Sequence, residues 1–298
     1  MTVSCKKCPT NLSHIIKRGF FRKSSGQHRN VQKYFCRSCK TYFCEQTSKV
    51  SYRDKKPDIN NSLFRMMASG LSQRRAAFIL GIHRKTVVRK NKKHSRFLDS
   101  FPVTVKQKVK TIVFDEMETF EHSKLKPLSI VVAVEEGSRR ILAIKTCQMP
   151  AKGLLVYRSL KKYGYRKDHR SKNLYSALKS LIPLVEKELI IKSDECPRYP
   201  SIVKNIFPNA RHLTFKGRRA CVVGQGELKA GGFDPLFSLN HTCAMIRDNI
   251  KSLCRRTWCT TKDPTHLQDR LNIYQAYHNQ ILVDKKRPPT LEAISDAV

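Results

Sequence analysis

The sequence of 298 residues is long enough for two or three folded units, at least one of which can bury a hydrophobic core. It holds 59 Lys and Arg against 23 Asp and Glu, a formal net charge of +36. Such an excess of positive charge is unfavourable without a polyanion, so it indicates a nucleic-acid partner. The excess is greatest in residues 1–100, which hold 24 Lys and Arg but only 4 Asp and Glu. We therefore expect this part of the chain to bind DNA.

No run of the sequence approaches the roughly 18 apolar residues that a membrane helix needs, and the start MTVSCKKC lacks the apolar core of a signal peptide. We therefore expect no membrane partner. We expect a location in the cytoplasm of a bacterium, in association with the nucleoid. The number of cysteines is odd, 11, and four of them form two CxxC pairs. In a reducing compartment this pattern indicates metal binding rather than a disulfide framework.

The two CxxC pairs predict a zinc ribbon in residues 1–50. Cys5 and Cys8 are separated by 27 residues from Cys36 and Cys39, and the spacer of each pair lets both thiolates reach one tetrahedral ion. Two short basic strands around a Ser-Ser-Gly turn are predicted between the pairs. Four unrelated free thiols are the alternative. Cys44 is interpreted as a buried thiol rather than an extra ligand.

Residues 55–98 predict a helix-turn-helix domain. The first helix ends at Gly70, Ser72 caps the second, and Gly81 begins the turn into the third, HRKTVVRKNKKH. The third helix would read the major groove of DNA. Its candidate DNA contacts are Arg84, Lys85, Thr86 and Arg89. A basic three-helix unit with a solvated face is the alternative, and the segment KNKKHSRFLDSFPVTVKQK is predicted as a linker, with a domain boundary near residue 100.

Residues 108–282 predict a mixed sheet flanked by helices, followed by a C-terminal tail at residues 283–298. Three antiparallel strands, KTIVFDEMETF, PLSIVVAVEE and RRILAIKTCQM, come first. A helix then leads to a fourth strand, ELIIKSDE, and a second helix to a fifth, ARHLTFK. This order is that of the RNase H-like fold. The predicted fold class is thus multidomain α/β: a zinc ribbon, a helix-turn-helix and an RNase H-like domain.

Two aspartates are predicted to meet in this sheet. Asp115 is placed at the end of the first strand and Asp194 at the end of the fourth, and in the RNase H-like fold these strands are neighbours at the sheet centre. Convergent carboxylates are what phosphoryl transfer on DNA requires, because Mg²⁺ or Mn²⁺ must be held around the phosphate. Each Asp taken alone is equally well interpreted as a turn or capping residue.

The segment LNHTCAMIRDNIKSLCRRTWCTTK closely resembles the end of the catalytic domain of IS-one-type insertion-sequence transposases. There a helix carries a Glu, and a basic residue follows seven positions later. The resemblance extends over nearly the whole chain and includes FDEM and SDECPRY around the two aspartates. It implies a transposase that binds double-stranded element ends and target DNA, works as a homo-oligomer on DNA, and uses Asp115 and Asp194 as Mg²⁺ ligands of a DDE triad.

The third triad position departs from that family. Seven residues before Arg247 stands Asn240, whose amide offers a neutral oxygen but no charge. We retain it as a catalytic candidate, with a helix cap as the alternative. Other candidates for the third ligand are His241, Glu227, Asp234 and Asp248.

A basic tract after Asn240 predicts contacts with DNA phosphates, although a solvated helix face would give the same pattern. Its residues are Arg247, Lys251, Arg255 and Arg256. A second basic segment, YRSLKKYGYRKDHRSK, is predicted as a surface loop that follows DNA. Two rival functions remain: a transposase-derived DNA-binding regulator without catalysis, and a zinc-ribbon transcription or replication factor with a structural sheet.

Overall fold

The computed structural model describes residues 5, 14–22, 30–101, 103–216, 234–254 and 259–291. The chain divides into two compact units, Met1–Asn60 and Asn61–Val298. The division into a ribbon, a helix-turn-helix, a catalytic domain and a tail stays a prediction. None of the helices in the described parts is long and apolar enough to cross a membrane.

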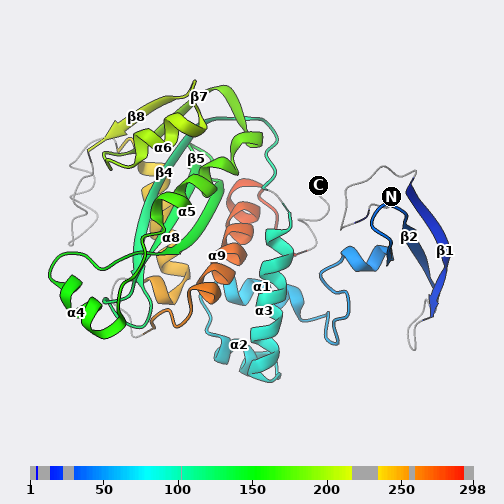
Figure 1. Ribbon diagram of the computed structural model, residues 1–298. Helices are drawn as coiled ribbons and strands as arrows, with labels where there is room; N and C mark the ends of the chain where they lie inside the picture. The colour runs from blue at the N-terminus through cyan, green and yellow to red at the C-terminus, as the bar shows by residue number, and fades with distance from the viewer. Residues whose placement is uncertain are drawn as a thin grey trace. The chain divides into compact units, whose positions relative to one another are not determined.

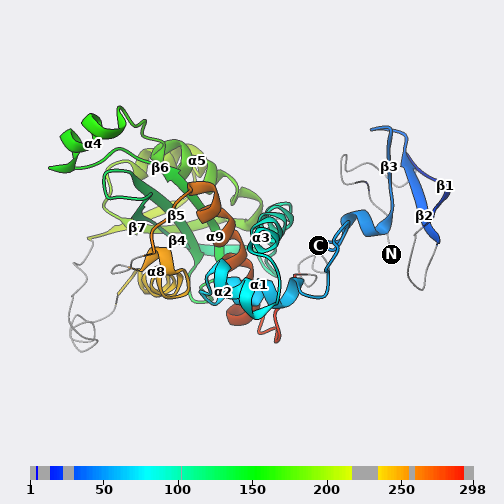
Figure 2. The ribbon, with the colours of Figure 1, turned by 90° about the horizontal axis from the view of Figure 1, so that it is seen from below.

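The first unit is built on a small antiparallel sheet. Its strands β1 (Ile15–Arg22), β2 (Asn30–Cys36) and β3 (Thr41–Phe43) pair in the order β1-β2-β3, as Figures 1 and 2 show in blue. The two predicted strands are therefore present, and the turn predicted between them lies outside the described residues. Tyr34 and Phe43 stack at 5.7 Å beside Cys36 and form a core too small to be stable without help. A 3₁₀ turn, Glu45–Ser48, follows.

Three helices begin the second unit: α1 (Asn60–Ala68), α2 (Gln73–Ile79) and α3 (Arg84–Asp99). The predicted Ser72 cap is present, because its hydroxyl accepts the Arg75 backbone N–H at 3.2 Å. Gly70 has a φ of +80°, and a Cβ there would lie 3.0 Å from the Asn249 carbonyl oxygen. Both observations favour glycine at this turn.

Helix α3 runs five residues beyond the predicted end at His94, so the interpretation of Ser95–Asp99 as part of a linker is wrong. The reason is the polarity of its buried face. Asn91 and His94 are buried together with Leu98, one or two turns apart, and hide the apolar periodicity that would have marked a helix. This face packs on α9 (Pro264–His278), where the Asn272 amide donates to Ser95 Oγ at 3.2 Å.

A five-stranded mixed sheet forms the centre of the second unit, in the order β6-β5-β4-β7-β8. β4 is antiparallel to β5 but parallel to β7, and β8 continues in parallel beyond β7. The bounds are β4 (Val109–Phe120), β5 (Pro127–Glu135), β6 (Ile141–Gln148), β7 (Val185–Asp194) and β8 (Arg211–Phe215). All five predicted strands are thus present, and Asp115 lies within β4 rather than at its end.

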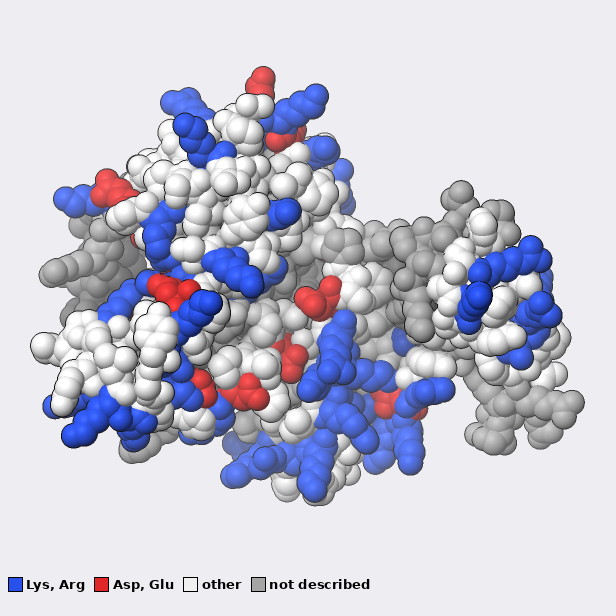
Figure 3. Space-filling view, viewed as in Figure 1, with Lys and Arg blue, Asp and Glu red and all other residues white. Residues whose placement is uncertain are grey.

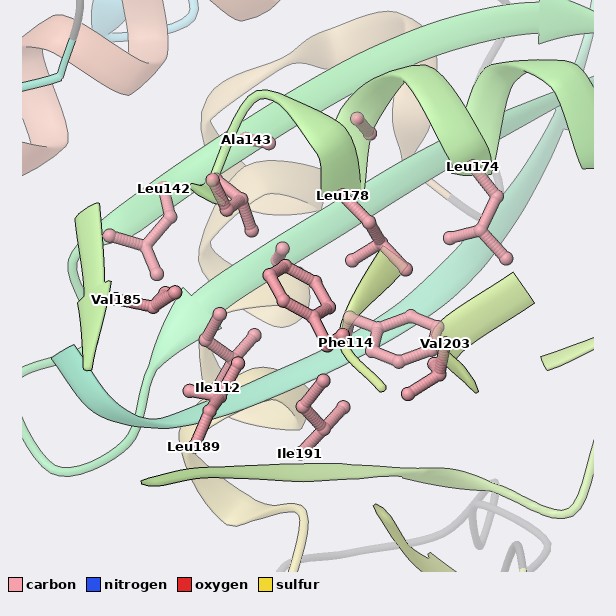
Figure 4. Packing of buried hydrophobic residues seen from close by; sticks show 14 of the residues in the cluster. Ile112, Phe114, Leu142, Ala143, Leu174, Leu178, Val185, Leu189, Ile191 and Val203 are labelled. Atoms are coloured by element: carbon pink, nitrogen blue, oxygen red, sulfur yellow. The ribbon is translucent and has the colours of Figure 1, made fainter. Parts of the chain in front are cut away.

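Helices cover both faces of this sheet and exclude water from its centre. On one face α5 (Arg170–Lys179) and α6 (Tyr199–Ile206) pack over Phe114, as Figure 4 shows. On the other face α8 (Phe237–Asn249) and α9 pack over Val113 and its neighbours. β5 is apolar along most of its length because it is buried on both sides.

The remaining elements are short, apart from one exposed helix. The segment predicted as a basic surface loop, residues 157–172, is helical in part: it holds most of α4 (Leu155–Tyr163) and the start of α5. Helix α4 lies outside the layers of the unit in both views (Figures 1 and 2). The 3₁₀ turns are Ile182–Leu184 and Lys251–Leu253, and a π-helical turn, Asn279–Val283, continues α9.

Candidate active site

Two aspartates meet on adjacent central strands. β4 and β7 run parallel with Val113 opposite Lys192, and two residues further along each strand stand Asp115 and Asp194. Because side chains alternate along a strand, both carboxylates lie on the face that α8 covers, together with Val113. The structure therefore brings together the two acids that the sequence pattern singled out.

The electrostatics of Asp115 reflect its burial and the neighbouring carboxylate. Burial and, to a smaller extent, the charge of Asp194 raise the pKa of Asp115 from 3.8 to about 6. Two hydrogen bonds to the ionised form act in the opposite direction, one from the Glu116 backbone N–H at 2.6 Å and one from Tyr199. Two like charges that share a partly buried position favour a cation between them.

A tyrosine and an arginine on α6 hold the acid strand in place. The Tyr199 hydroxyl donates to Asp115 Oδ1 at 3.2 Å and lies 3.4 Å from Glu116 Oε2, while Arg198 forms an ion pair with Glu116. Tyr199 is buried against the Phe114 ring, at 4.8 Å between centroids. Sequence reasoning marked a Tyr-containing helix after Asp194 but assigned no role to Tyr199 or Glu116.

Helix α8 crosses the face that carries the two acids. Its buried Cys243 has a pKa raised to about 12, chiefly by burial, with smaller effects from Arg247 and from the Asp115 charge. Cys243 packs in the same cluster as Val113 on β4 and lies one turn before Arg247. Asn240 and Arg247 are two helical turns apart, so they lie in one row beside Cys243.

Each described candidate for the third ligand interacts with a different residue. Asn240 donates to Asp234 Oδ2 at 2.8 Å, and Asp234 Oδ1 accepts the Leu236 N–H at the start of α8. His241 lies 2.9 Å from the Arg139 guanidinium in the turn between β5 and β6. Asp248 contributes to a raised pKa of Tyr274, which places it towards α9. Glu227 lies outside the described residues, and the third ligand stays a prediction.

The substitution Asp194→Asn is expected to stabilise the metal-free protein. An acid whose pKa is raised on folding lowers the free energy of unfolding as the pH rises, here between 3.8 and about 6. Removing the Asp194 charge relieves part of this loss, by about 1 kcal/mol above that range and by little below it. Urea denaturation without divalent ions, at one pH below and one pH above the range, measures the difference.

The matched control for that experiment is Glu195→Gln, which removes the same charge from the exposed neighbouring residue. It should leave the free energy of unfolding nearly unchanged at both pH values, because an exposed charge is screened by solvent. Equal stabilisation by both variants would show that the protein's net charge, not the acid pair, is responsible.

Three thiols in the first unit could hold one metal ion. The sulfur atoms of Cys5, Cys36 and Cys39 lie within 4.8 Å of one another, and those of Cys5 and Cys39 are 3.5 Å apart. A tetrahedral zinc ion with Zn–S bonds of about 2.3 Å separates its sulfur ligands by about 3.8 Å, so the three thiols fit it. Cys8 lies outside the described residues. Cys44 is buried and contacts Thr47 Oγ1 at 3.4 Å instead.

The predicted DNA contacts on α3 point outward. Arg84, Lys85 and Arg89 are exposed and Thr86 is half-buried. Figure 3 shows Lys and Arg side chains crowded over the region of α2 and α3. Of the basic tract after Asn240, Arg247 is half-buried and Lys251 is exposed, while Arg255 and Arg256 lie outside the described residues.

Comparisons with known proteins give no family. No protein-family model matches the sequence, and no curated protein matches it either. Among solved structures, the chain is similar to one described as the cryo-EM structure of simian T-cell lymphotropic virus intasome in complex with PP2A regulatory subunit B56 gamma. The TM-score is 0.33 and the sequence identity 12%, over 77% of this chain and 74% of that chain. A likeness of this size carries no argument about fold or function.

Proposed function

We propose that the protein is a transposase that binds the ends of an insertion element and catalyses metal-dependent cleavage and transfer of DNA strands. The observation that carries this proposal is the pairing of Asp115 with Asp194 on the two central parallel strands. The sheet order β6-β5-β4-β7-β8 supports an RNase H-like interpretation of this domain. The departure at Asn240 leaves membership of the IS-one-type family a proposal.

In this proposal the chain's own residues position the reacting DNA. A bound Mg²⁺ or Mn²⁺ would activate a water molecule or the 3′-hydroxyl of the DNA and stabilise the charge on the leaving oxygen. Asp115 and Asp194 are the residues that would hold it, and the donation from Tyr199 fixes the orientation of Asp115. Arg247, one turn after Cys243 on α8, is the cation that would attract a DNA phosphate.

The other parts of the chain would bind DNA. We interpret α1 to α3 as a helix-turn-helix whose exposed Arg84, Lys85 and Arg89 contact the element end. The Cys5, Cys36 and Cys39 group would hold a structural zinc ion in a zinc ribbon. Cleavage of paired ends requires a homo-oligomer on DNA. The proposed location is the cytoplasm of a bacterium.

One observation favours a second candidate, a DNA-binding regulator without catalysis. Asn240 supplies no charge and its amide group donates to Asp234. A protein with two acids and no third ligand would bind DNA and leave it intact.

The decisive experiment uses a labelled duplex that carries the terminal repeats of the element, incubated with the full-length protein and Mg²⁺ or Mn²⁺. Cleavage at the repeat end and joining of the freed 3′-hydroxyl to target DNA are the expected products. Tight binding with neither product in either metal would overturn the transposase proposal in favour of the regulator. Products that persist in excess EDTA would contradict the metal-dependent mechanism.

A further inference from the structure

Helix α4 exposes an unusual amount of apolar and aromatic surface. Of its nine residues only Ser159 is buried, and Tyr157 is 73% exposed. On either side of the helix, Leu154 is 97% and Tyr165 is 82% exposed. A group of large exposed side chains in one place generally marks a binding surface.

The segment Lys152–Lys167, here called the α4 arm, is nevertheless attached firmly to the sheet. The Ser159 hydroxyl donates to the Leu125 carbonyl oxygen at 2.7 Å in the turn between β4 and β5. The buried Arg166 guanidinium donates to the carbonyl oxygens of Met149 and Pro127 at 3.4 and 3.3 Å. These hydrogen bonds fix the base of the arm, while its outer side chains remain exposed to solvent.

The arm begins close to the acid pair. Lys152 forms an ion pair with Glu118 on β4, and Glu118 is three residues beyond Asp115, with its side chain on the opposite face of the strand. At about 3.3 Å per strand residue these positions are about 10 Å apart along the strand, which corresponds to about three nucleotides of a DNA strand. A DNA end cut at the acid pair would therefore reach the arm where an unpaired strand passes from one face of β4 to the other.

The charge of the arm favours one of two possible partners, which are DNA and a second copy of this chain. The arm contains six Lys and Arg and no Asp or Glu, and all of its cations except Arg166 are exposed. A second copy of this chain, with its net charge of +36, would oppose so basic a surface. Tyrosines interleaved with cations suit unpaired nucleotides, because bases stack on the rings while the cations neutralise phosphates. The observations thus favour DNA.

We propose that the α4 arm binds unpaired nucleotides of the DNA end beside the acid pair. Bases stack on Tyr157 and Tyr165, and Arg158, Lys161 and Lys162 contact the phosphates between them. Tyr163 serves a different purpose, because its ring lies under Lys126 at 5.5 Å and belongs to the attachment of the arm. This inference rests on the proposed function, since it places the arm on the strand that the acid pair would cut.

The test compares the affinity of the full-length protein for a blunt duplex with its affinity for the same duplex extended by a run of unpaired thymidines, followed by fluorescence anisotropy. Thymidines suffice because stacking tolerates any base. The wild type should prefer the extended duplex. Tyr157→Ala should reduce that preference about tenfold, Tyr165→Ala should do likewise, and affinity for the blunt duplex should not change.

Two control variants separate stacking from folding. Tyr157→Phe should retain the preference because the ring remains, and Tyr175→Ala, which removes a tyrosine on α5, should also retain it. If both alanine variants still prefer the extended duplex, the proposal is overturned. The same holds if the wild type cuts DNA but binds the two duplexes equally well. Survival of the preference with loss of a dimer in sedimentation would assign the arm to protein association. A wild type that binds neither DNA would instead overturn the proposed function itself.

Discussion

Substitution of Asp115 by Asn should reduce strand cleavage by about 10²- to 10³-fold or more, the effect of removing one electrostatic group from a catalytic site. The amide keeps the size and the hydrogen bond from Tyr199 but removes the charge that holds a divalent cation. DNA affinity should be almost unchanged, because the proposed DNA contacts Arg84, Lys85 and Arg89 lie on α3 and not on β4. The rate of cleavage of a labelled element end, measured at saturating protein, separates the two effects.

The matched control is Glu118→Gln on the same strand. Its carboxylate is half exposed, on the face opposite that of Asp115, and pairs with Lys152. This variant should cleave at nearly the wild-type rate. If Asp115→Asn cleaves as fast as Glu118→Gln, the acid pair is not the catalytic centre, whatever DNA the protein binds.

Loss of the Cys36 thiol should unfold the first unit and leave the second folded. Zinc contributes about 10–16 kcal/mol of apparent free energy to small zinc-binding domains, more than a core of Tyr34 and Phe43 can replace. In Cys36→Ser, therefore, proteolysis should remove the first unit rapidly while the second resists. Limited proteolysis with metal analysis of the intact protein measures both, and a strong chelator should reproduce the variant.

Cys44→Ser is the control for this prediction. Cys44 is as buried as the cluster cysteines but contacts Thr47, so its substitution should leave zinc content and protease resistance close to those of the wild type. Equal loss of zinc in both variants would mean that Cys44 is a ligand. Full protease resistance of metal-free Cys36→Ser would mean that the unit is stable without metal.

The sheet and the acid pair were predictable because they depend on local patterns. β4, β5 and β7 contain apolar runs bounded by turns, and the RNase H-like order of elements predicts that β4 and β7 are neighbours. Asp115 and Asp194 follow from that order. The sequence pattern could not show that Tyr199 donates to Asp115, since this bond depends on how α6 packs against Phe114.

The helices were harder to predict where polar residues are buried or apolar residues are exposed. Helix α3 buries Asn91 and His94, so its inner face has a polar sequence, and α4 exposes Tyr157 and Leu160, so its sequence resembles a loop of mixed character. The burial of α3 depends on tertiary packing, which the local pattern of the chain does not encode.

The attachment of α3 to α9 has a consequence for the DNA. Asn272 bonds to Ser95 on α3, Arg270 donates to the Leu71 carbonyl oxygen, and Phe64 packs on Tyr277, so the three N-terminal helices and the sheet form one body. If α3 binds the element end, this body holds the recognised sequence at a fixed distance from the acid pair. The cut would then fall a fixed number of base pairs from the recognised sequence, on a fixed side of the double helix.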